Sequence, residues 1–478
     1  MAITLYCLLQ FHLLFYYKQR KKDYLLGLSD TPLSTDDLPH VTVQLPIYNE
    51  KYVVKRLLES ITAFDYPKEL MEIQLLDDST DDTVVISAEE VSKYQSEGYD
   101  IQHVRRENRE GFKAGALKSA TQHAKGELIA IFDADFLPEK DFLKKTVQHF
   151  KDPKVGVVQT RWEHLNQDYS LLTRVQALQL NVHFTVEQLG RKVGNLLLQF
   201  NGTAGVWRKE CINDAGGWEA DTLTEDLDLS YRAQLKGWKI HYLEDVTSPA
   251  ELPAEMNGLR SQQFRWMKGG AETAKKVLPQ VWKSHLSVRQ KIHASIHLLG
   301  STVFLAVFSI GIFSVPLAVA MKPLGFDPNY FAFFLVGLAS IIVIYYVANV
   351  QVAWPKESWW KMIFKFLLLF PIFLALSMGL SFHNSIAVIQ GYLGKKSPFV
   401  RTPKFDVRGL GDQIAKKSYF SKKIGKTILW EGFFAIYFLI GLIWGIVNNE
   451  PTFIIMHFLL TIGYGLIFYF SIRNVFLR

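Results

Sequence analysis

The stretch "GELIAIFDADF", residues 126–136, joins an apolar strand to an acidic end. The run "LIAIF" has the length and composition of a buried strand. Asp133 and Asp135 follow directly, so their carboxylates lie where the strand stops. In open sheets of parallel strands, ligands bind beyond the carboxyl ends of the strands. The stretch therefore predicts a sheet and the position of a functional site on it.

Further predicted strands and helices lie on both sides of this stretch in the sequence. Further strands are predicted at "HVTVQLP", "MEIQLLDD" and "YDIQHVRR". Helices are predicted over 51–63, 82–97, 111–124 and 139–150. Short apolar strands that alternate with helices indicate an α/β fold, with a mostly parallel sheet flanked by helices on both faces.

Composition divides the chain of 478 residues, which is 49% hydrophobic and 21% charged. Charged and apolar residues mix from about 40 to 290, whereas long apolar runs dominate from about 296 onward. The sequence thus predicts an α-helical transmembrane domain after the α/β domain. The formal net charge of +7 does not indicate nucleic acid, because many basic residues flank the apolar runs, where they orient helices and meet anionic lipid.

Four charge-free stretches are long enough to cross a bilayer: 298–321, 328–355, 366–394 and 451–472. A fifth, 428–449, contains only Glu431 as a charge. The segment 395–426 holds ten Lys and Arg against two Asp, which predicts a cytosolic location. A full crossing at 366–394 would place that segment outside, so 357–393 is predicted to lie in the interface or to re-enter. An additional crossing is the alternative.

The N-terminal run 2–17 is uncharged and ends in "KQRKK", which predicts a membrane anchor with a cytosolic C-terminal end. The two cysteines, Cys7 and Cys211, lie in different environments and predict no disulfide, as in a reduced cytosolic domain. The chain is expected to be a multi-pass protein of the plasma or inner membrane. The predicted domains are an anchor (1–22), a cytosolic α/β domain (38–292), a transmembrane helix pair (293–356), an interfacial or re-entrant helix with a cytosolic loop (357–426) and a second pair (427–478).

Asp77 and Asp78 close the strand "IQLL", so adjacent strand ends bring four carboxylates to one edge. Like charges at this spacing repel unless a cation or a donor-rich ligand joins them. The Asp133-x-Asp135 pattern suits a hard divalent ion, Mg²⁺ or Mn²⁺, although such a tripeptide can also be a turn. Asp77 and Asp78 suit the hydrogen-bond donors of a base or ribose.

Three further segments suit the same ligand. "PIYNE" (46–50) ends the first strand and offers Tyr48 and Glu50 to a base, although Tyr48 alone suits packing equally well. "ENREGFKAGALKSA" (107–120) starts a helix with Lys113 near its first turn, which suits a diphosphate. In "TLTEDLDLS" (222–230), Asp226 begins a helix, where it caps the helix or serves as a general base.

The stretch "SQQFRWMKGG" (261–270) precedes the first long apolar run. Arg265 and Trp266 are residues that favour the membrane interface, so an anchoring role is one interpretation. The second interpretation comes from the order of the motifs "LLDDST", "FDADF", "TLTEDLDLS" and "QQFRW" along the chain. This series resembles that of the membrane-embedded family 2 glycosyltransferases, the cellulose and hyaluronan synthase type. "LDDSTDDT", "REGFKAGAL" and "FVRTPK" (399–404) look most like the cellulose synthase-like A and C group.

The resemblance covers about residues 40–410 and implies a GT-A-type fold and a role for each motif. It implies that Asp226 is the general base of an inverting transfer from a UDP- or GDP-linked sugar. Asp133 and Asp135 would hold Mg²⁺ or Mn²⁺, and Asp133 and Arg265 would also meet the diphosphate. The residues it places beside the acceptor are Gln262, Trp266, and Gly202 and Thr203 of "FNGTAG". The residues it places in a gating loop over the nucleotide are Phe399, Thr402 and Lys404.

The function that this resemblance implies is polymerisation of a β-linked polysaccharide, with a 1,4 linkage, from UDP-glucose or GDP-mannose. The partners are then the nucleotide sugar, the growing glycan and the bilayer through which the glycan is exported. Two alternatives remain open. One is transfer of a single sugar to a membrane lipid such as ceramide or a polyprenyl phosphate, and the other is a transporter or scaffold with an inactive enzyme domain.

Overall fold

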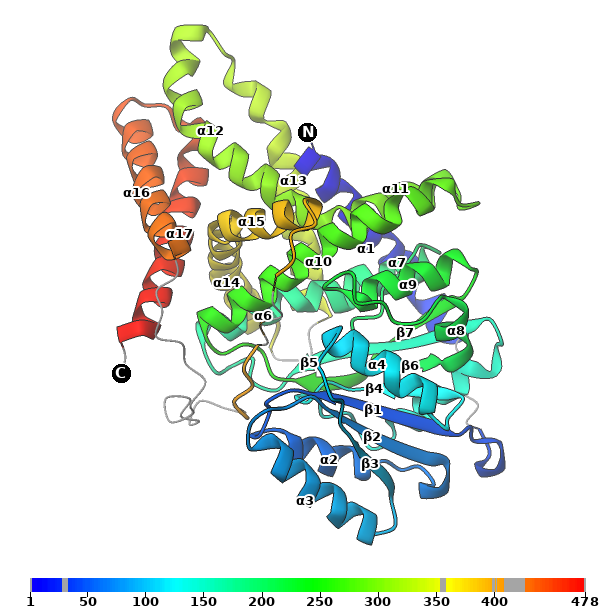
Figure 1. Cartoon of the computed structure of the whole chain (residues 1–478). Coiled ribbons are helices and arrows are strands. Elements are labelled where there is room, and N and C mark those ends of the chain that lie inside the picture. The colour runs from blue at the N-terminus through cyan, green and yellow to red at the C-terminus, as the bar shows by residue number, and fades with distance from the viewer. Residues whose placement is uncertain are drawn as a thin grey trace.

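A central sheet of seven strands forms the core of the α/β domain in the computed structural model (Figure 1). The structure describes residues 2–27, 33–352, 358–397, 400, 402–407 and 426–476. From edge to edge, the strands are β3 (Asp100–Val104), β2 (Met71–Asp77), β1 (Val41–Ile47), β4 (Leu128–Ile131), β6 (Gly205–Arg208), β5 (Val155–His164) and β7 (Lys239–Ala250).

The sheet is mostly parallel, as predicted. β3, β2, β1 and β4 are parallel to one another, and β5 is parallel to β7. β6 runs antiparallel to both of its neighbours. Its direction follows from its starting point, because Thr203 just before it accepts a hydrogen bond from the backbone N–H of Asp133 at the carboxyl end of β4. A strand that begins at that edge can only run away from it.

Both faces of the sheet are buried under helices. The alternation along β4 shows this, because Leu128 and Ala130 enter one apolar cluster while Ile129 and Ile131 enter the other. The first cluster includes side chains of α2 (Val54–Thr62), α3 (Thr83–Ser96) and α5 (Phe142–Val147). The second includes side chains of α4 (Phe112–His123), α8 (Lys209–Asp214) and α9 (Glu225–Leu235). The predicted strands and helices of residues 41–150 are confirmed.

Longer helices connect this domain to the apolar part of the chain. α6 (Leu171–Val182) continues through a π-helical turn (His183–Glu187) into α7 (Gln188–Val193). α10 (Met256–Lys283) carries the "QQFRW" motif and is followed by α11 (Val288–Leu298). α1 (Ala2–Gly27) runs from the apolar helices to the α/β domain, where Tyr17 donates a hydrogen bond of 2.9 Å to Glu244 of β7 (Figure 1).

The C-terminal half is helical, with α12 (Val303–Leu324), α13 (Phe333–Tyr346), α14 (Trp359–Gly379), α15 (Ser381–Tyr392), α16 (Lys426–Val447) and α17 (Ile454–Phe476). Five described segments are long and apolar enough to cross a membrane: Gly300–Met321, Asn329–Gln351, Trp359–Gly379, Thr427–Val447 and Pro451–Arg473. Within the described part, α1 is not among them. Cys7 of α1 and Cys211 of α8 are both buried and unpaired, as predicted.

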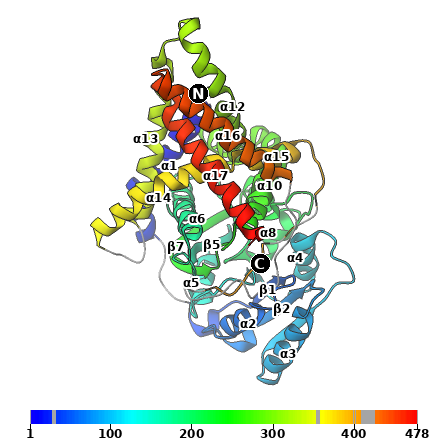
Figure 2. The same ribbon diagram turned by 90° about the vertical axis from the view of Figure 1, so that its left-hand side faces the viewer.

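The apolar stretch 366–394 is divided between two helices. α14 ends at Gly379 and α15 begins at Ser381. α14 packs closely on α17 at this point, since a side chain at Gly379 would lie 2.5 Å from the carbonyl carbon of Gly463 on α17. Toward Trp359, α14 (yellow) projects away from the α16–α17 pair (Figure 2). α15 then lies on α10, where a side chain at Gly391 would be 2.6 Å from the carbonyl oxygen of Lys268.

Candidate active site

A cavity of about 230 Å³ lies at the carboxyl ends of β1, β2 and β4. It lies where the strand ends predicted a ligand site. The predicted site residues that line it are Tyr48, Glu50, Asp78, Lys113, Asp133, Asp135, Gly202, Asp226, Gln262, Arg265, Trp266, Thr402 and Lys404.

Three predicted residues are not part of this lining. Asp77 ends β2 but points to the neighbouring strand, where its carboxylate lies 2.8 Å from His103 Nε2 and accepts the backbone N–H of Ser79. Thr203 is fully buried and holds the backbone of Asp133. Phe399 lies outside the described residues.

Asp133 and Asp135 each face a lysine. Asp133 Oδ1 lies 2.5 Å from Lys113 Nζ, and Asp135 Oδ2 lies 2.6 Å from Lys404 Nζ. Burial opposes the charge of Lys113, but the nearby Asp133 and Glu225 carboxylates outweigh burial and raise its pKa. The two aspartates thus lie in one cavity, each paired with a lysine. A hard divalent ion prefers such carboxylate oxygens, so the residues fit Mg²⁺ or Mn²⁺.

The end of β2 presents one carboxylate to the cavity. Arg106 binds the Asp78 carboxylate in a bidentate contact, in which Nε and Nη2 donate to the two oxygens at 3.0 and 2.5 Å. Beside it, the Arg109 guanidinium stacks on the Tyr48 ring, 3.3 Å from the ring centroid. A flat cation over an aromatic ring, next to carboxylates, makes a surface suited to a planar base.

Asp226 lies at the first turn of α9, with its side chain in the cavity wall. Burial raises the pKa of its carboxyl group to about 7, and the charge of Glu225 adds to the shift. Gly202 (φ +78°) lies so close that a Cβ there would be 3.0 Å from Asp226 Oδ2. A carboxylate with a pKa near neutrality is suited to accept a proton from a hydroxyl group.

Residues 39–269 match the family model described as Glycosyltransferase like family 2. The chain carries a family 2 glycosyltransferase domain. It is 44% identical over 261 residues to the probable glucomannan 4-beta-mannosyltransferase 4 of Oryza sativa subsp. japonica, over 53% of this chain and 48% of that protein. It is 42% identical over 259 residues to glucomannan 4-beta-mannosyltransferase 2 of Arabidopsis thaliana, again over 53% and 48%. The chain spans about half the length of the curated relatives it matches.

A solved structure supports the fold of this domain. A mannosyltransferase from Pyrobaculum calidifontis in complex with GDP-Man and Mn²⁺ aligns with a TM-score of 0.50 and 19% sequence identity. The alignment covers 83% of this chain and 99% of that protein. At this identity the likeness shows the fold, and the predicted GT-A-type architecture is confirmed.

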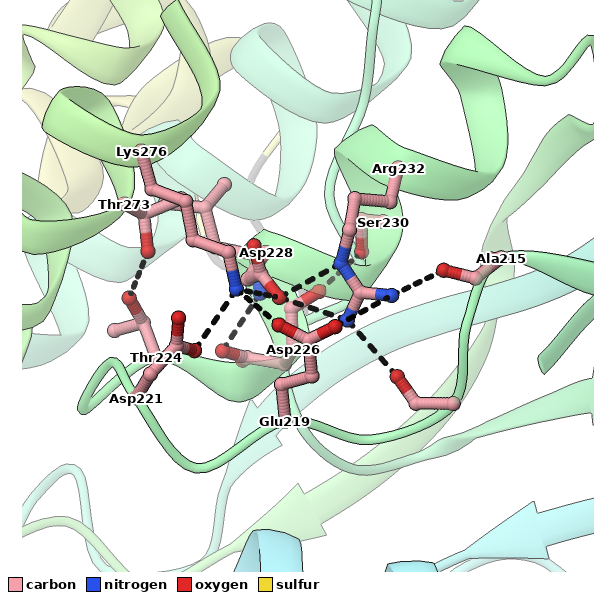
Figure 3. Close-up of polar contacts among 12 residues, drawn as sticks. Ala215, Glu219, Asp221, Thr224, Asp226, Asp228, Ser230, Arg232, Thr273 and Lys276 are labelled. Atoms are coloured by element: carbon pink, nitrogen blue, oxygen red, sulfur yellow. Dashed lines mark hydrogen bonds and ion pairs between the residues drawn. The ribbon is translucent and has the colours of Figure 1, made fainter. Parts of the chain in front are cut away.

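A cluster of acidic side chains lies near Asp226 and contacts the helix that carries it (Figure 3). Glu219, Asp221 and Asp228 place carboxylate oxygens within 4.8 Å of one another. Lys276 of α10 lies among them, at 2.5, 2.8 and 3.2 Å, and Arg232 pairs with Asp228. Two cations pair with these three carboxylates, and Lys276 joins Asp228 of α9 to α10. It fixes the helix that carries Asp226.

α10 brings the "QQFRW" motif to the cavity rim. Gln262, Arg265 and Trp266 all line the cavity. Arg265 Nη2 donates to Thr402 Oγ1 at 2.9 Å, and Arg265 also contacts the carbonyl oxygen of Val400. Burial lowers the pKa of Arg265 to about 10, so its guanidinium stays charged near neutral pH.

Residues 402–407 dock on the domain next to Asp135. The Glu251 carboxylate accepts the backbone N–H groups of Phe405 and Val407, at 2.7 and 3.4 Å. Arg56 forms ion pairs with Glu251 and with Asp406, which lies between Phe405 and Val407 in the sequence. Phe405 and Val407 are buried beneath this network. The segment is therefore held over the cavity by a buried ionic network from three distant parts of the chain.

A second cavity, of about 480 Å³, extends from the first toward the apolar helices. Its walls include side chains of α1, α12, α13 and α14, such as Tyr6, Phe304, Tyr345 and Phe373. The residues that line both cavities are Trp162, Leu180, Asn201, Thr224, Asp226 and Trp266. Asp226 and Trp266 thus stand at the junction between a polar chamber and one that faces the helices.

Several residues of the site were not predicted from the sequence. Arg106 and Arg109 follow the strand "YDIQHV", so their place at a strand end was a usable signal. Glu251 follows β7 in the same way, but its role depends on a segment about 150 residues later, which no local pattern reveals. Asn201 adjoins the predicted Gly202 and lines both cavities.

Proposed function

We propose that the chain is an inverting mannosyltransferase that uses GDP-mannose to extend a β-1,4-linked polysaccharide. Of the two donors that the sequence leaves open, the mannosyl donor is favoured because relatives 44% and 42% identical are named glucomannan 4-beta-mannosyltransferases. The observation that carries the proposal is the position of Asp226. Its carboxylate stands at the junction of the two cavities, within the electrostatic reach of Lys113.

The arrangement suits one direct displacement. The Asp226 carboxylate accepts the proton of the acceptor hydroxyl, whose oxygen forms a bond to the anomeric carbon of the donor. The bond from that carbon to the diphosphate oxygen breaks, and the nucleoside diphosphate leaves with the electron pair. Attack opposite the leaving group inverts the anomeric centre, so an α-linked donor gives a β-glycoside. Lys113 and Arg265 are cations fixed near the place where the leaving charge develops.

Asp133 and Asp135 would hold the divalent ion, Mg²⁺ or Mn²⁺. When bound, the ion supplies positive charge to the diphosphate oxygens. Lys113 and Lys404 now contact these carboxylates. In the proposed complex, the same lysines turn toward the diphosphate. Asp78 and Glu50 accept hydrogen bonds from the nucleoside, and Tyr48 with Arg109 lies against its base.

Transfer is expected to fall as the pH drops through about 7. Burial and the charge of Glu225 raise the pKa of Asp226 to about 7. Below this pH, the carboxyl group is protonated and cannot accept the proton of the acceptor. A profile of kcat against pH at saturating GDP-mannose should show one acidic limb with a midpoint near 7. A profile that is flat from about pH 6 to 8 would contradict the assignment of Asp226 as the base.

Gly202→Ala is expected to reduce kcat by about 10- to 100-fold, because a small displacement of a catalytic group can cost this much. The added methyl group would lie 3.0 Å from Asp226 Oδ2 and would sit on a backbone with φ +78°. Gly217→Ala is the matched control, since Gly217 also has φ +78° but has open space around its Cβ position. Equal losses of kcat in the two variants would show that backbone strain, and not contact with Asp226, explains the effect.

The second cavity suits a hydroxyl-rich acceptor that leaves toward the membrane. Arg191 lines it and is 3% exposed, and its charge acts on the Glu187 carboxylate, which also lines this cavity. Gln10 and Ser301 also line it, each with a buried oxygen that lacks a partner in the described structure. A sugar chain supplies hydroxyl groups for all of these, so we place the growing glycan in this cavity. Export through the adjoining helices is part of the proposal.

The proposed topology keeps residues 402–407 in the cytosol together with the catalytic domain. Its support is the contact of Lys404 with Asp135, which puts both on one side of any membrane. α12 with α13, and α16 with α17, then cross as two pairs. α14 and α15 make no net crossing, although α14 has the length and composition of a span. α1 is the proposed N-terminal anchor.

The proposed donor can be tested with the full chain reconstituted in liposomes with Mn²⁺ or Mg²⁺. Radiolabelled GDP-mannose, UDP-glucose and UDP-GlcNAc are supplied separately, and release of nucleoside diphosphate and incorporation of label are measured. We expect label to enter a polymer only from GDP-mannose. Polymer from UDP-glucose alone would overturn the donor assignment, and label that enters only a lipid would overturn polymerisation.

A further inference from the structure

A buried ion pair joins α10 to the last two helices of the chain. Arg260 Nη1 lies 2.9 Å from Glu431 Oε2 of α16, and the same nitrogen donates to Ser471 Oγ of α17 at 3.1 Å. Arg260 Nη2 donates to Thr427 Oγ1, also of α16, at 2.8 Å. The side chains of Arg260 and Glu431 are 9% and 1% exposed. One buried guanidinium therefore binds both helices of the α16–α17 pair.

These contacts lie at one end of the α16–α17 pair. Glu431 is near the first residue of α16, and Ser471 is near the last residue of α17. In the proposed topology this end is cytosolic, since α16 follows residues 402–407 in the chain. Glu431 belongs to a segment, Thr427–Val447, that is long and apolar enough to cross a membrane. An ionisable residue in such a segment is costly, and its partner commonly marks a functional contact.

Arg260 lies on the side of α10 that faces away from the candidate active site. It lines neither of the two cavities, whereas Gln262, Arg265 and Trp266 of the same helix line the first, and Trp266 lines both. At about 100° per residue, these three residues lie about 140° to 240° around the helix from Arg260. The distance from Arg260 to Trp266 along the helix axis is about 9 Å. The start of α10 is thus bound to the helix pair on one side and presents its motif to the cavities on the other.

Further contacts hold the same part of α10. His383 Nε2–H of α15 donates to the carbonyl oxygen of Arg260 at 3.1 Å. Met256 and Leu259 belong to an apolar cluster that also contains Ile467 of α17. Of the described residues of α16 and α17, none lines either cavity. The helix pair therefore acts on the candidate active site through the elements that it contacts, and α10 is the one that carries site residues.

We propose that Arg260 is a positioning residue, through which the α16–α17 pair fixes the start of α10 and so sets the place of the "QQFRW" motif relative to Asp226. The inference rests on the proposed function, and it gives the C-terminal helix pair a role in transfer besides anchoring the chain. Binding of the nucleotide does not use this contact, because Tyr48 follows β1 and Asp78 follows β2, at the edge of the sheet.

The test uses the full chain in liposomes, with GDP-mannose as donor. Arg260→Met combined with Glu431→Met replaces the ion pair by apolar residues, a change that often leaves stability intact. The hydroxyl groups left behind can donate to carbonyl oxygens of their own helices. Arg260→Lys keeps the charge beside Glu431 but lacks the planar fork that reaches both helices.

Ser314→Ala is the matched control. Ser314 Oγ lies 2.8 Å from His457 Nε2, so this buried contact joins α12 to α17 as the Arg260 contacts join α10 to it. Neither Ser314 nor His457 lines a cavity. The quantities measured for every variant are kcat, the Kd and stoichiometry of GDP-mannose binding, and the thermal midpoint of unfolding. The stoichiometry counts the folded molecules, so kcat is expressed per donor-binding site.

The double variant is expected to lower kcat about tenfold per donor-binding site, because a small displacement of groups at the site is costly. Arg260→Lys should lower it by about threefold, and Ser314→Ala should leave it unchanged. The Kd for GDP-mannose should stay within about threefold of wild type in all variants. The thermal midpoint of the double variant should stay close to that of wild type. Arg260→Lys carries the same comparison if the double variant does not fold.

An unchanged kcat in both Arg260 variants would overturn the inference. A fall of kcat that only matches a loss of donor-binding sites, or an equal fall in Ser314→Ala, would also overturn it, since either result shows a purely structural contact. A wild-type chain that transfers nothing from GDP-mannose would instead overturn the proposed function, and the inference with it.

Discussion

Asp226→Asn is expected to lower the rate of transfer by about 10²- to 10⁴-fold, the usual contribution of a general base. The asparagine side chain has the same shape but cannot take a proton from the acceptor hydroxyl. The nucleotide residues Asp78 and Tyr48 are untouched, so the Kd for GDP-mannose should stay within about threefold of wild type. Single-turnover transfer and calorimetric titration of the donor measure the two quantities separately.

Asp228→Asn is the matched control for this variant. Asp228 lies two residues further along α9 and is fully buried, but it faces Arg232 and Lys276 and does not line the cavity. It should lower the thermal midpoint of unfolding, because it weakens a buried ionic contact. It should retain most of the transfer activity per folded molecule. If Asp226→Asn keeps near-normal transfer, Asp226 is not the base.

Asp135→Asn is expected to weaken metal-dependent binding of GDP-mannose by about 100-fold or more, since even residues that only orient metal ligands cost 10- to 100-fold. Asp135 is 3% exposed and lies in the cavity beside Asp133. An amide oxygen carries no formal charge and binds a hard divalent ion more weakly than a carboxylate. Titration of the donor with and without Mn²⁺ measures the effect.

Asp141→Asn is the control for this second variant. Asp141 lies six residues later, pairs with Lys145 at the surface and does not line the cavity. It should bind GDP-mannose as wild type does, with the same dependence on Mn²⁺. If Asp135→Asn binds the donor in Mn²⁺ as tightly as the control, the Asp133-x-Asp135 pair does not hold the ion.

The sheet and its acidic edge could be predicted from sequence because the signals are local. Each of β1, β2 and β4 is a short apolar run that ends in polar residues, and parallel strands bring such ends together. The pair Asp77 and Asp78 shows the limit of this reasoning. Neighbouring residues at a strand end point in opposite directions, so only the three-dimensional structure shows that Asp78 faces the cavity and Asp77 faces His103.

Contacts between distant segments could not be predicted. Arg56 and Asp406 are separated by 350 positions, and Tyr231 and His297 by 66. No periodicity or motif links the members of either pair, because each contact depends on how whole elements pack. The direction of β6 depends on a contact between distant segments in the same way. The residues that line the candidate site were therefore more predictable than the residues that hold them in place.

The nature of the product decides whether the chain polymerises a β-1,4-mannan. The full chain in liposomes is incubated with radiolabelled GDP-mannose and Mn²⁺, and the product is divided between a lipid extract and an insoluble fraction. We expect an insoluble polymer that an endo-β-1,4-mannanase digests completely to labelled oligosaccharides. A product that resists this enzyme, or label found only in the lipid extract, would contradict a β-1,4-mannan polymerase.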